Sequence, residues 1–132
     1  MTASRYRRPI LAAAAATALA LASAATASSP GVTKDEIDHL LQYVATSSCT
    51  FVRNGSEYPA GKARDHLESK YRFVAGRISS AEDFIRYLAT KSSLSGEAYH
   101  VKCGKTDALS GAWLTAELAR YRNSAHLSHT AR

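Results

Sequence analysis

The fold of this chain is decided by the stretch Cys49-Thr50-Phe51-Val52-Arg53-Asn54-Gly55-Ser56-Glu57-Tyr58. Two short runs that contain β-branched and aromatic residues flank its central Asn-Gly pair. Asn-Gly between such runs is a strong hairpin signal, because a type I′ turn needs positive φ at both central residues. The stretch therefore predicts an antiparallel hairpin in which Arg53 faces Ser56 and Phe51 faces Tyr58.

A later strand is expected to join this hairpin. The segment Ala98–Cys103 alternates between apolar and polar residues, which is typical of a half-buried strand. If Cys49 faces Cys103 in an antiparallel pair, then Phe51 faces Val101. We therefore predict a three-stranded sheet with the Cys49 strand in the middle, and we interpret residues 104–109 as a connector.

Helical segments surround these strands. Apolar residues recur at helical spacing in four parts of the chain. The helices are predicted to begin near Thr33, Ala60, Ser79 or Ser80, and Ser110. Thr33 and Glu36 have the spacing of a capping box at the first of them. The expected fold class is α+β, a small three-stranded antiparallel sheet (hairpin plus late strand) covered on one face by about four helices.

The N-terminal residues have the pattern of a secretory signal peptide. A basic start is followed by an apolar run made mostly of alanine, and Ala25-Thr26-Ala27 then offers small residues for cleavage. A retained membrane anchor is the alternative, but alanine, serine and threonine contribute little transfer energy. We expect a signal peptide over residues 1–27, its cleavage, and a periplasmic or secreted protein with no stable membrane anchor.

The rest of the chain is long enough for one domain. We expect a linker over residues 28–32, a single globular α+β domain over residues 33–122 and a flexible C-terminal tail over residues 123–132. The tail is polar and lacks a periodic apolar pattern.

The two cysteines are expected to form a disulfide. Cys49 and Cys103 are the only cysteines in the sequence, and an even count in an exported protein indicates a disulfide. Closing a loop of this length stabilises a fold by roughly 4 kcal/mol in the chain-entropy model. A metal pair or two free thiols are the alternatives, but no histidine stands at ligand spacing. We predict no metal site and no cofactor.

The charge of the chain argues against a nucleic-acid partner. The sequence has 17 Lys+Arg against 11 Asp+Glu, a net charge of +6. Three of the arginines lie in the expected signal peptide, which leaves 14 against 11, a net charge of +3. No run of like charges forms a polybasic patch.

Several groups of residues between Ile37 and Tyr121 form a pattern found in a known family. They are Phe51 to Tyr58, His66-Leu67 with Lys70-Tyr71, Arg77-Ile78, Ala81-Glu82-Asp83-Phe84-Ile85, Ser92-Ser93-Leu94-Ser95-Gly96 followed by Tyr99, and Trp113-Leu114. In these residues the chain resembles the YfeK-like family of small exported bacterial proteins of uncharacterised function. The resemblance implies a periplasmic single domain and implies no reaction.

A set of polar residues forms the candidate ligand-binding site. The set consists of Arg53, His66, Lys70, Arg77, Ser92, Ser93 and Ser95. His66 and Lys70 are four residues apart and therefore project from the same side of a helix. Convergent cations and hydroxyls suit a carboxylate or phosphate group. Each residue also has a structural explanation, such as Lys70 lying along the core edge or Arg53 pairing with Glu57.

The leading hypothesis is a periplasmic accessory protein, a non-catalytic binding module for a small anionic ligand or an envelope partner protein. One alternative is a small envelope hydrolase that uses a loop serine with His66 as base. No Gly-x-Ser-x-Gly motif supports it, and we assign no catalytic residue. The other alternative is a purely structural protein that docks on an envelope complex.

Overall fold

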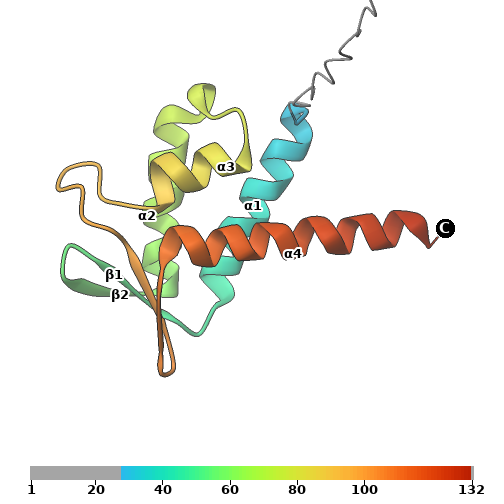
Figure 1. Cartoon of the computed structure of the whole chain (residues 1–132). Coiled ribbons are helices and arrows are strands. Elements are labelled where there is room, and N and C mark those ends of the chain that lie inside the picture. The colour runs from blue at the N-terminus through green and yellow to red at the C-terminus, as the bar shows by residue number, and fades with distance from the viewer. Residues whose placement is uncertain (1–27, 132) are drawn as a thin grey trace, which may run out of the picture.

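The computed structural model describes residues 28–131. The expected signal peptide, residues 1–27, lies outside the described residues. The elements in chain order are α1 (Pro30–Thr46), β1 (Thr50–Arg53), β2 (Ser56–Pro59), α2 (Ala60–Val74), the 3₁₀ turn η1 (Ala75–Arg77), α3 (Ala81–Phe84), the π-helical turn η2 (Ile85–Ala89), β3 (His100–Cys103), β4 (Thr106–Leu109) and α4 (Ser110–Thr130). The fold is α+β, as the sequence predicts (Figure 1).

The predicted hairpin is confirmed. Phe51 pairs with Tyr58 and Arg53 pairs with Ser56 across the antiparallel strands β1 and β2. The turn residues Asn54 and Gly55 have φ values of 50° and 75°. Positive φ at both positions is what a type I′ turn requires, so the local sequence sets the register of this hairpin.

The predicted pairing with the late strand is also confirmed. β1 pairs antiparallel with β3, and Phe51 lies opposite Val101. Cys49 and Cys103 form a disulfide at the end of this pair. β1 therefore lies between β2 and β3, and the disulfide holds β1 to β3.

The sheet has four strands, so the prediction of three is wrong. Residues 106–109, which the sequence placed in a connector, form β4 and pair antiparallel with β3. The strand order is β2-β1-β3-β4. Asp107 and Ala108 have low β-propensity, so the sequence of β4 does not look like a strand. A turn at Gly104, with a φ of 61°, brings it back against β3.

The core lies between one face of the sheet and the helices (Figure 1). Phe51 and Val101 are buried on that face, as predicted, whereas Lys102 on the other face is exposed. The largest fully buried side chains are Phe84, Ile37, Leu40, Leu114, Leu118, Val44 and Val101. They come from α1, α3, α4 and β3, so the core joins the two ends of the described chain.

The first helix begins earlier than predicted. α1 starts at Pro30, whose fixed φ suits the first turn of a helix, so the helix includes part of the expected linker. Thr33 lies inside α1 and donates a hydrogen bond to the carbonyl of Ser79 at 3.3 Å. Glu36 pairs with Arg122. The predicted capping box is therefore wrong, because tertiary partners take both side chains.

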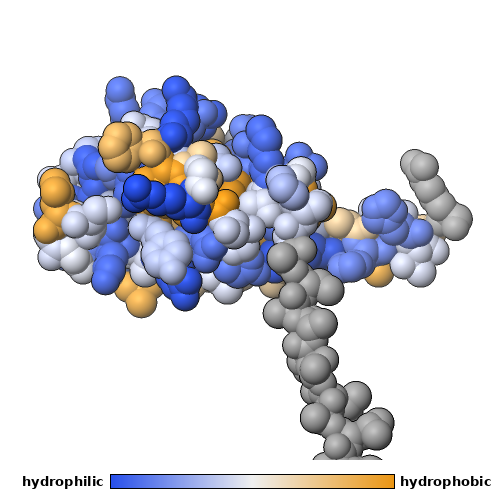
Figure 2. Space-filling model, turned by 90° about the horizontal axis from the view of Figure 1, so that it is seen from above, coloured by the Kyte–Doolittle hydropathy of each residue, from blue (hydrophilic) through white to orange (hydrophobic). Residues whose placement is uncertain are grey.

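The last helix continues through most of the expected tail. α4 runs to Thr130, and residues 123–130 are exposed. Figure 2 shows this end of α4 extending from the body of the molecule. The hydroxyls of Ser124 and Ser128 bond carbonyls one turn earlier, which is compatible with helical backbone. None of the helices in the described part of the chain is long and apolar enough to span a membrane.

The two hairpins and the helices that follow them repeat at an interval of 50 residues. β1, β2 and α2 begin at residues 50, 56 and 60, and β3, β4 and α4 begin at residues 100, 106 and 110. The β1–β3 pairing is symmetric about Phe51 and Val101. We call residues 50–74 the first hairpin–helix unit and residues 100–130 the second.

Candidate functional site

A small cavity lies between the first hairpin–helix unit and the start of α4. Its volume is about 40 Å³, and Phe51, Ala63 and Leu67 supply an apolar lining. Its polar lining comes from Arg53, Tyr58, Lys62, His66, Tyr99, His100 and Ser110. None of these lining residues is acidic. We call this cavity the pocket.

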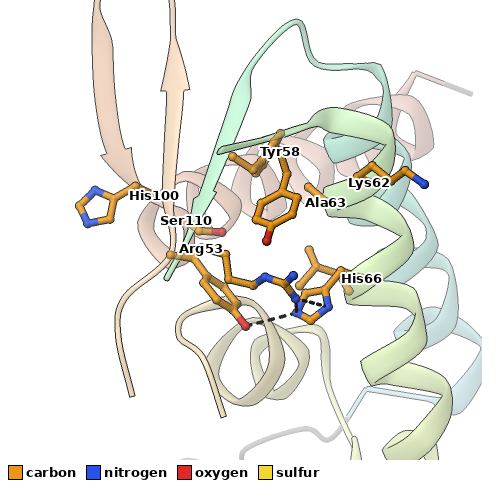
Figure 3. A pocket seen from close by; sticks show the side chains of 10 residues that line it. Arg53, Tyr58, Lys62, Ala63, His66, His100 and Ser110 are labelled. Atoms are coloured by element: carbon orange, nitrogen blue, oxygen red, sulfur yellow. Dashed lines mark hydrogen bonds between the residues drawn. The ribbon is translucent and has the colours of Figure 1, made fainter. Parts of the chain in front are cut away.

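Figure 3 shows how the labelled residues of the pocket lie. The Arg53 guanidinium reaches the His66 ring, and the Tyr58 hydroxyl points toward the same place. The Lys62 amine and the His100 ring point away from it. His100 instead contacts Asp107, with 2.9 Å between Nδ1 and Oδ1. The polar centre of the pocket is therefore the contact between Arg53 and His66.

Arg53 contacts the His66 ring. Its Nη1 lies 2.7 Å from Nδ1 and 3.0 Å from Nε2. Because Nη1 is within 3.0 Å of both ring nitrogens, it lies against the ring and not along the lone pair of one nitrogen. An arginine is always protonated and cannot accept, so this close contact favours the neutral form of His66.

Tyr99 continues this chain of contacts. Its hydroxyl oxygen lies 3.4 Å from Nε2 of His66, and Lys70 donates to the same oxygen at 3.3 Å. The Tyr99 oxygen therefore accepts from Lys70 beside the His66 ring, and the hydroxyl also has a proton that it can donate.

The charges around the pocket favour a negatively charged ligand. Burial, and then the charges of Arg53 and Lys70, lower the pKa of His66 below its usual value. Burial and the Arg53 charge likewise lower the pKa of Lys70. Within residues 28–131, no carboxylate forms an ion pair with Arg53, His66 or Lys70. The cations therefore repel one another without an internal counter-charge.

Two helices begin at the pocket. Lys62 and Ala63 belong to the first turn of α2, and Ser110 is the first residue of α4. Neither helix has a side-chain cap or an acidic residue in its first turn. The positive ends of both helix dipoles therefore lie near the pocket without a negative side chain to compensate them.

Ser110 places a hydroxyl at the same location. The residue is only 3% exposed, and it lines the pocket. Its amide donates to the carbonyl of Tyr99 at 2.9 Å. Within residues 28–131 no buried side-chain oxygen lacks a partner, so the Ser110 hydroxyl is satisfied or reached by solvent, and it can donate to a ligand on the pocket side.

Lys70 is close to the pocket but has a structural role. Its Nζ donates to the carbonyl of Leu88 at 2.8 Å and lies 3.5 Å from the carbonyl of Lys91. These carbonyls lie at and beyond the end of η2, where helical partners are missing. Lys70 therefore connects α2 to η2, and its ammonium group places a positive charge next to the Tyr99 hydroxyl.

The loop serines are used to hold the first hairpin. The hydroxyl of Ser95 donates to Oδ1 of Asn54 at 2.6 Å. The buried hydroxyl of Ser92 accepts from the amides of Leu94 and Ser95 at 3.3 Å. Ser93 is exposed. None of these three serines lines the pocket, so the structure does not bring them to His66 as the sequence suggested.

Arg77 lies outside the pocket as well. It is in η1, after the C-terminal end of α2, and lines a separate depression with Arg72 and Phe73. His66 lies in the first half of α2, so the length of this helix separates the two residues. Of the candidate set, only Arg53 and His66 line the pocket.

Sequence reasoning missed Tyr58, Tyr99 and Ser110 as pocket residues. The predicted pairing of Phe51 with Tyr58 was the available signal for Tyr58, because it placed the Tyr58 ring opposite Phe51 at the edge of the core face. Nothing in the sequence signalled Ser110, since its position depends on the unrecognised strand β4. Within residues 28–131, no group of three or more histidine, cysteine or acidic residues could hold a metal ion.

Comparisons with known proteins identify relatives of unknown function. A family model described as "Family of unknown function (DUF5329)" matches residues 32–122. The chain is also similar to the uncharacterized protein YfeK of Salmonella typhimurium, with 42% identity over 50 residues. That match covers 38% of this chain and 42% of the Salmonella protein, which is less than half of the length of either. No solved structure matches the chain.

Proposed function

This chain belongs to the DUF5329 family of unknown function, and we propose that its pocket binds a small anionic group. One observation carries the proposal. Arg53 contacts the neutral His66 ring at 2.7 Å, Lys70 contacts the neighbouring Tyr99 hydroxyl, and no carboxylate within residues 28–131 pairs with any of the three. The like charges of Arg53 and Lys70 in this half-buried site are costly unless an anion compensates them.

The donors around the pocket fit such a guest. Arg53 offers guanidinium N–H groups, and the hydroxyls of Tyr99 and Ser110 have protons to donate. The uncapped start of α4 adds a positive partial charge. An anion would therefore receive several hydrogen bonds from groups that the fold already holds in place.

We also propose that the protein works in the periplasm or outside the cell. The Cys49–Cys103 disulfide supports this location, because disulfides persist in oxidising compartments. The signal-like pattern of residues 1–27 points the same way.

The experiment compares two arginine substitutions. Binding of acetate and inorganic phosphate is measured by calorimetry for the wild type, Arg53→Ala and the control Arg86→Ala. Arg86 is an exposed arginine that pairs with Asp83 and does not line the pocket. We expect Arg53→Ala to weaken anion binding by about tenfold or more, because it removes a charge-assisted donor, and Arg86→Ala to leave it unchanged. Equal binding by all three proteins would reject the site.

A hydrolase is the alternative, and the contacts favour it less. Ser92 and Ser95 bond Asn54 or backbone amides, and neither hydroxyl bonds His66. A serine nucleophile needs a base within hydrogen-bond reach. Labelling of a loop serine by a serine-directed probe would support the hydrolase.

A further inference from the structure

We infer, building on the proposed function, that the anionic group is a carboxylate that enters between Arg53 and His66 and binds together with one proton, which the His66 ring takes up. The inference concerns both the class of ligand and the way in which pH controls its binding. It rests on the shape of the pocket and on the contacts of the His66 ring.

The shape of the pocket selects a small, planar anion. A volume of about 40 Å³ has room for roughly three water-sized groups, if each needs on the order of 10–15 Å³. A carboxylate consists of one carbon and two oxygens, whereas a phosphoryl group is tetrahedral and larger. The guanidinium of Arg53 is planar and matches a carboxylate edge, and Phe51 and Leu67 can contact the carbon that bears it.

The His66 ring has a position for one more proton. The contact with the Arg53 guanidinium favours the neutral ring, which has one nitrogen without a proton. The groups that face the ring are Arg53 from β1, Tyr58 from β2, Lys70 from α2 and Tyr99 beside β3. None of these groups is an acid that would stabilise an imidazolium. Burial and the charges of Arg53 and Lys70 lower the pKa of His66.

A carboxylate between Arg53 and His66 supplies a negative charge next to the His66 ring and so favours its protonated form. It replaces the His66 ring as the neighbour of the Arg53 guanidinium, so that Arg53 donates to one carboxylate oxygen. A proton from hydronium or a buffer acid then binds the unprotonated ring nitrogen, and the new N–H donates to the other oxygen. The N–H bond forms as the bond of the proton donor breaks, and the site gains one negative charge from the ligand and one positive charge from the proton.

The test measures proton uptake during binding. Formate, acetate and inorganic phosphate are titrated into the protein from about pH 5 to about pH 8 in two buffers that differ in ionisation enthalpy. We expect both carboxylates to bind more tightly than phosphate, with uptake approaching one proton per ligand near neutral pH. Their affinity should fall by up to about tenfold per pH unit as the pH rises through this range.

Two histidine variants provide the control. His66→Gln removes the titrating ring and should make carboxylate binding weaker and independent of pH, with proton uptake near zero. His126→Gln changes an exposed ring near the end of α4, outside the pocket, and should behave as the wild type. If His66→Gln does not fold, the wild-type uptake in the two buffers and the NMR titration of the His66 ring still decide the question.

Each outcome has a separate meaning. Anion binding without proton uptake would overturn the inference and leave the proposed function standing. Tighter binding of phosphate than of carboxylates would overturn the ligand class. Absence of any anion binding would overturn both. A short peptide with a free C-terminal carboxylate, compared with its C-terminal amide, distinguishes a protein end from a small acid as the source of the group.

Discussion

The two hairpin–helix units have the same lengths of strand and turn but opposite charge arrangements. In the first unit, Arg53 and His66 contact each other, and no acid within the described residues compensates them. In the second unit, the charges of α4 are paired with acids or bases of other helices. The second unit uses its charges to hold the helices together, whereas the function proposed above assigns the compensation of Arg53 in the first unit to a bound anion.

The paired charges of the second unit centre on Arg122. Its Nε and Nη2 donate to the carboxylate of Glu36 at 2.7 and 2.9 Å, and it also pairs with Glu82. Glu36 and Glu82 raise the pKa of Arg122 above its usual value. On the same helix, Glu117 pairs with His39 of α1 at 2.7 Å. These pairs join α4 to α1 and α3.

The largest expected effect comes from the disulfide, which links the two units. Replacing Cys49 and Cys103 together with serine opens a loop of 54 residues, and we expect the free energy of unfolding to fall by about 2–4 kcal/mol. Chemical denaturation measures this change. Hydrogen exchange should become faster in both hairpins. Faster exchange in only one hairpin would show that the disulfide does not couple the two units.

The second effect tests the paired charges of α4. Glu36→Gln removes a buried carboxylate from Arg122, and we expect a loss of about 2 kcal/mol. Arg122 keeps Glu82 and some exposure to water, so the loss stays below that of a fully buried pair. Glu57→Gln is the matched control, because Glu57 pairs with Lys102 on the exposed face of the sheet and should leave stability near wild type. Equal losses in both variants would refute the structural role of the Arg122 cluster.

Lys70→Met should have a smaller effect on stability. The methionine keeps an apolar stem but cannot donate to the carbonyl of Leu88, and we expect a loss of about 1 kcal/mol in thermal or chemical unfolding. Lys62→Met, an exposed position of the same helix, is the control. If Lys70→Met is as stable as the control, then Lys70 serves the ligand and not the fold.

The smallest effect is a pH dependence of stability in the first unit. The pKa of His66 is lower in the folded protein than in the unfolded chain, so the unfolded chain binds more protons just below pH 6.5. Stability is therefore lost as the pH falls through this region. Over the same decrease in pH, the His66→Gln variant should lose less stability than the wild type. Parallel curves would contradict the assigned environment of His66, and the lowered pKa of His39 affects both proteins alike.

Much of the first unit was predictable from local sequence. Asn54-Gly55 set the turn, the alternation of the strands set the Phe51–Val101 pairing, and the apolar periodicity set α2 from Ala60 to Val74. The second unit was less predictable, because β4 has few β-forming residues and is stabilised by its partner β3. The candidate site was predictable only in Arg53 and His66.

The sequence by itself determined the α+β class, the hairpin, the disulfide pair and the presence of cations near the hairpin. Turns, strand alternation and helix periodicity act between neighbouring residues, and such short-range rules can be read along the chain. Only the tertiary structure decided which cations are compensated. Glu36 and Arg122 are 86 positions apart in the chain and pair through packing of α1 on α4, whereas Arg53 and His66 meet with no acid at hand.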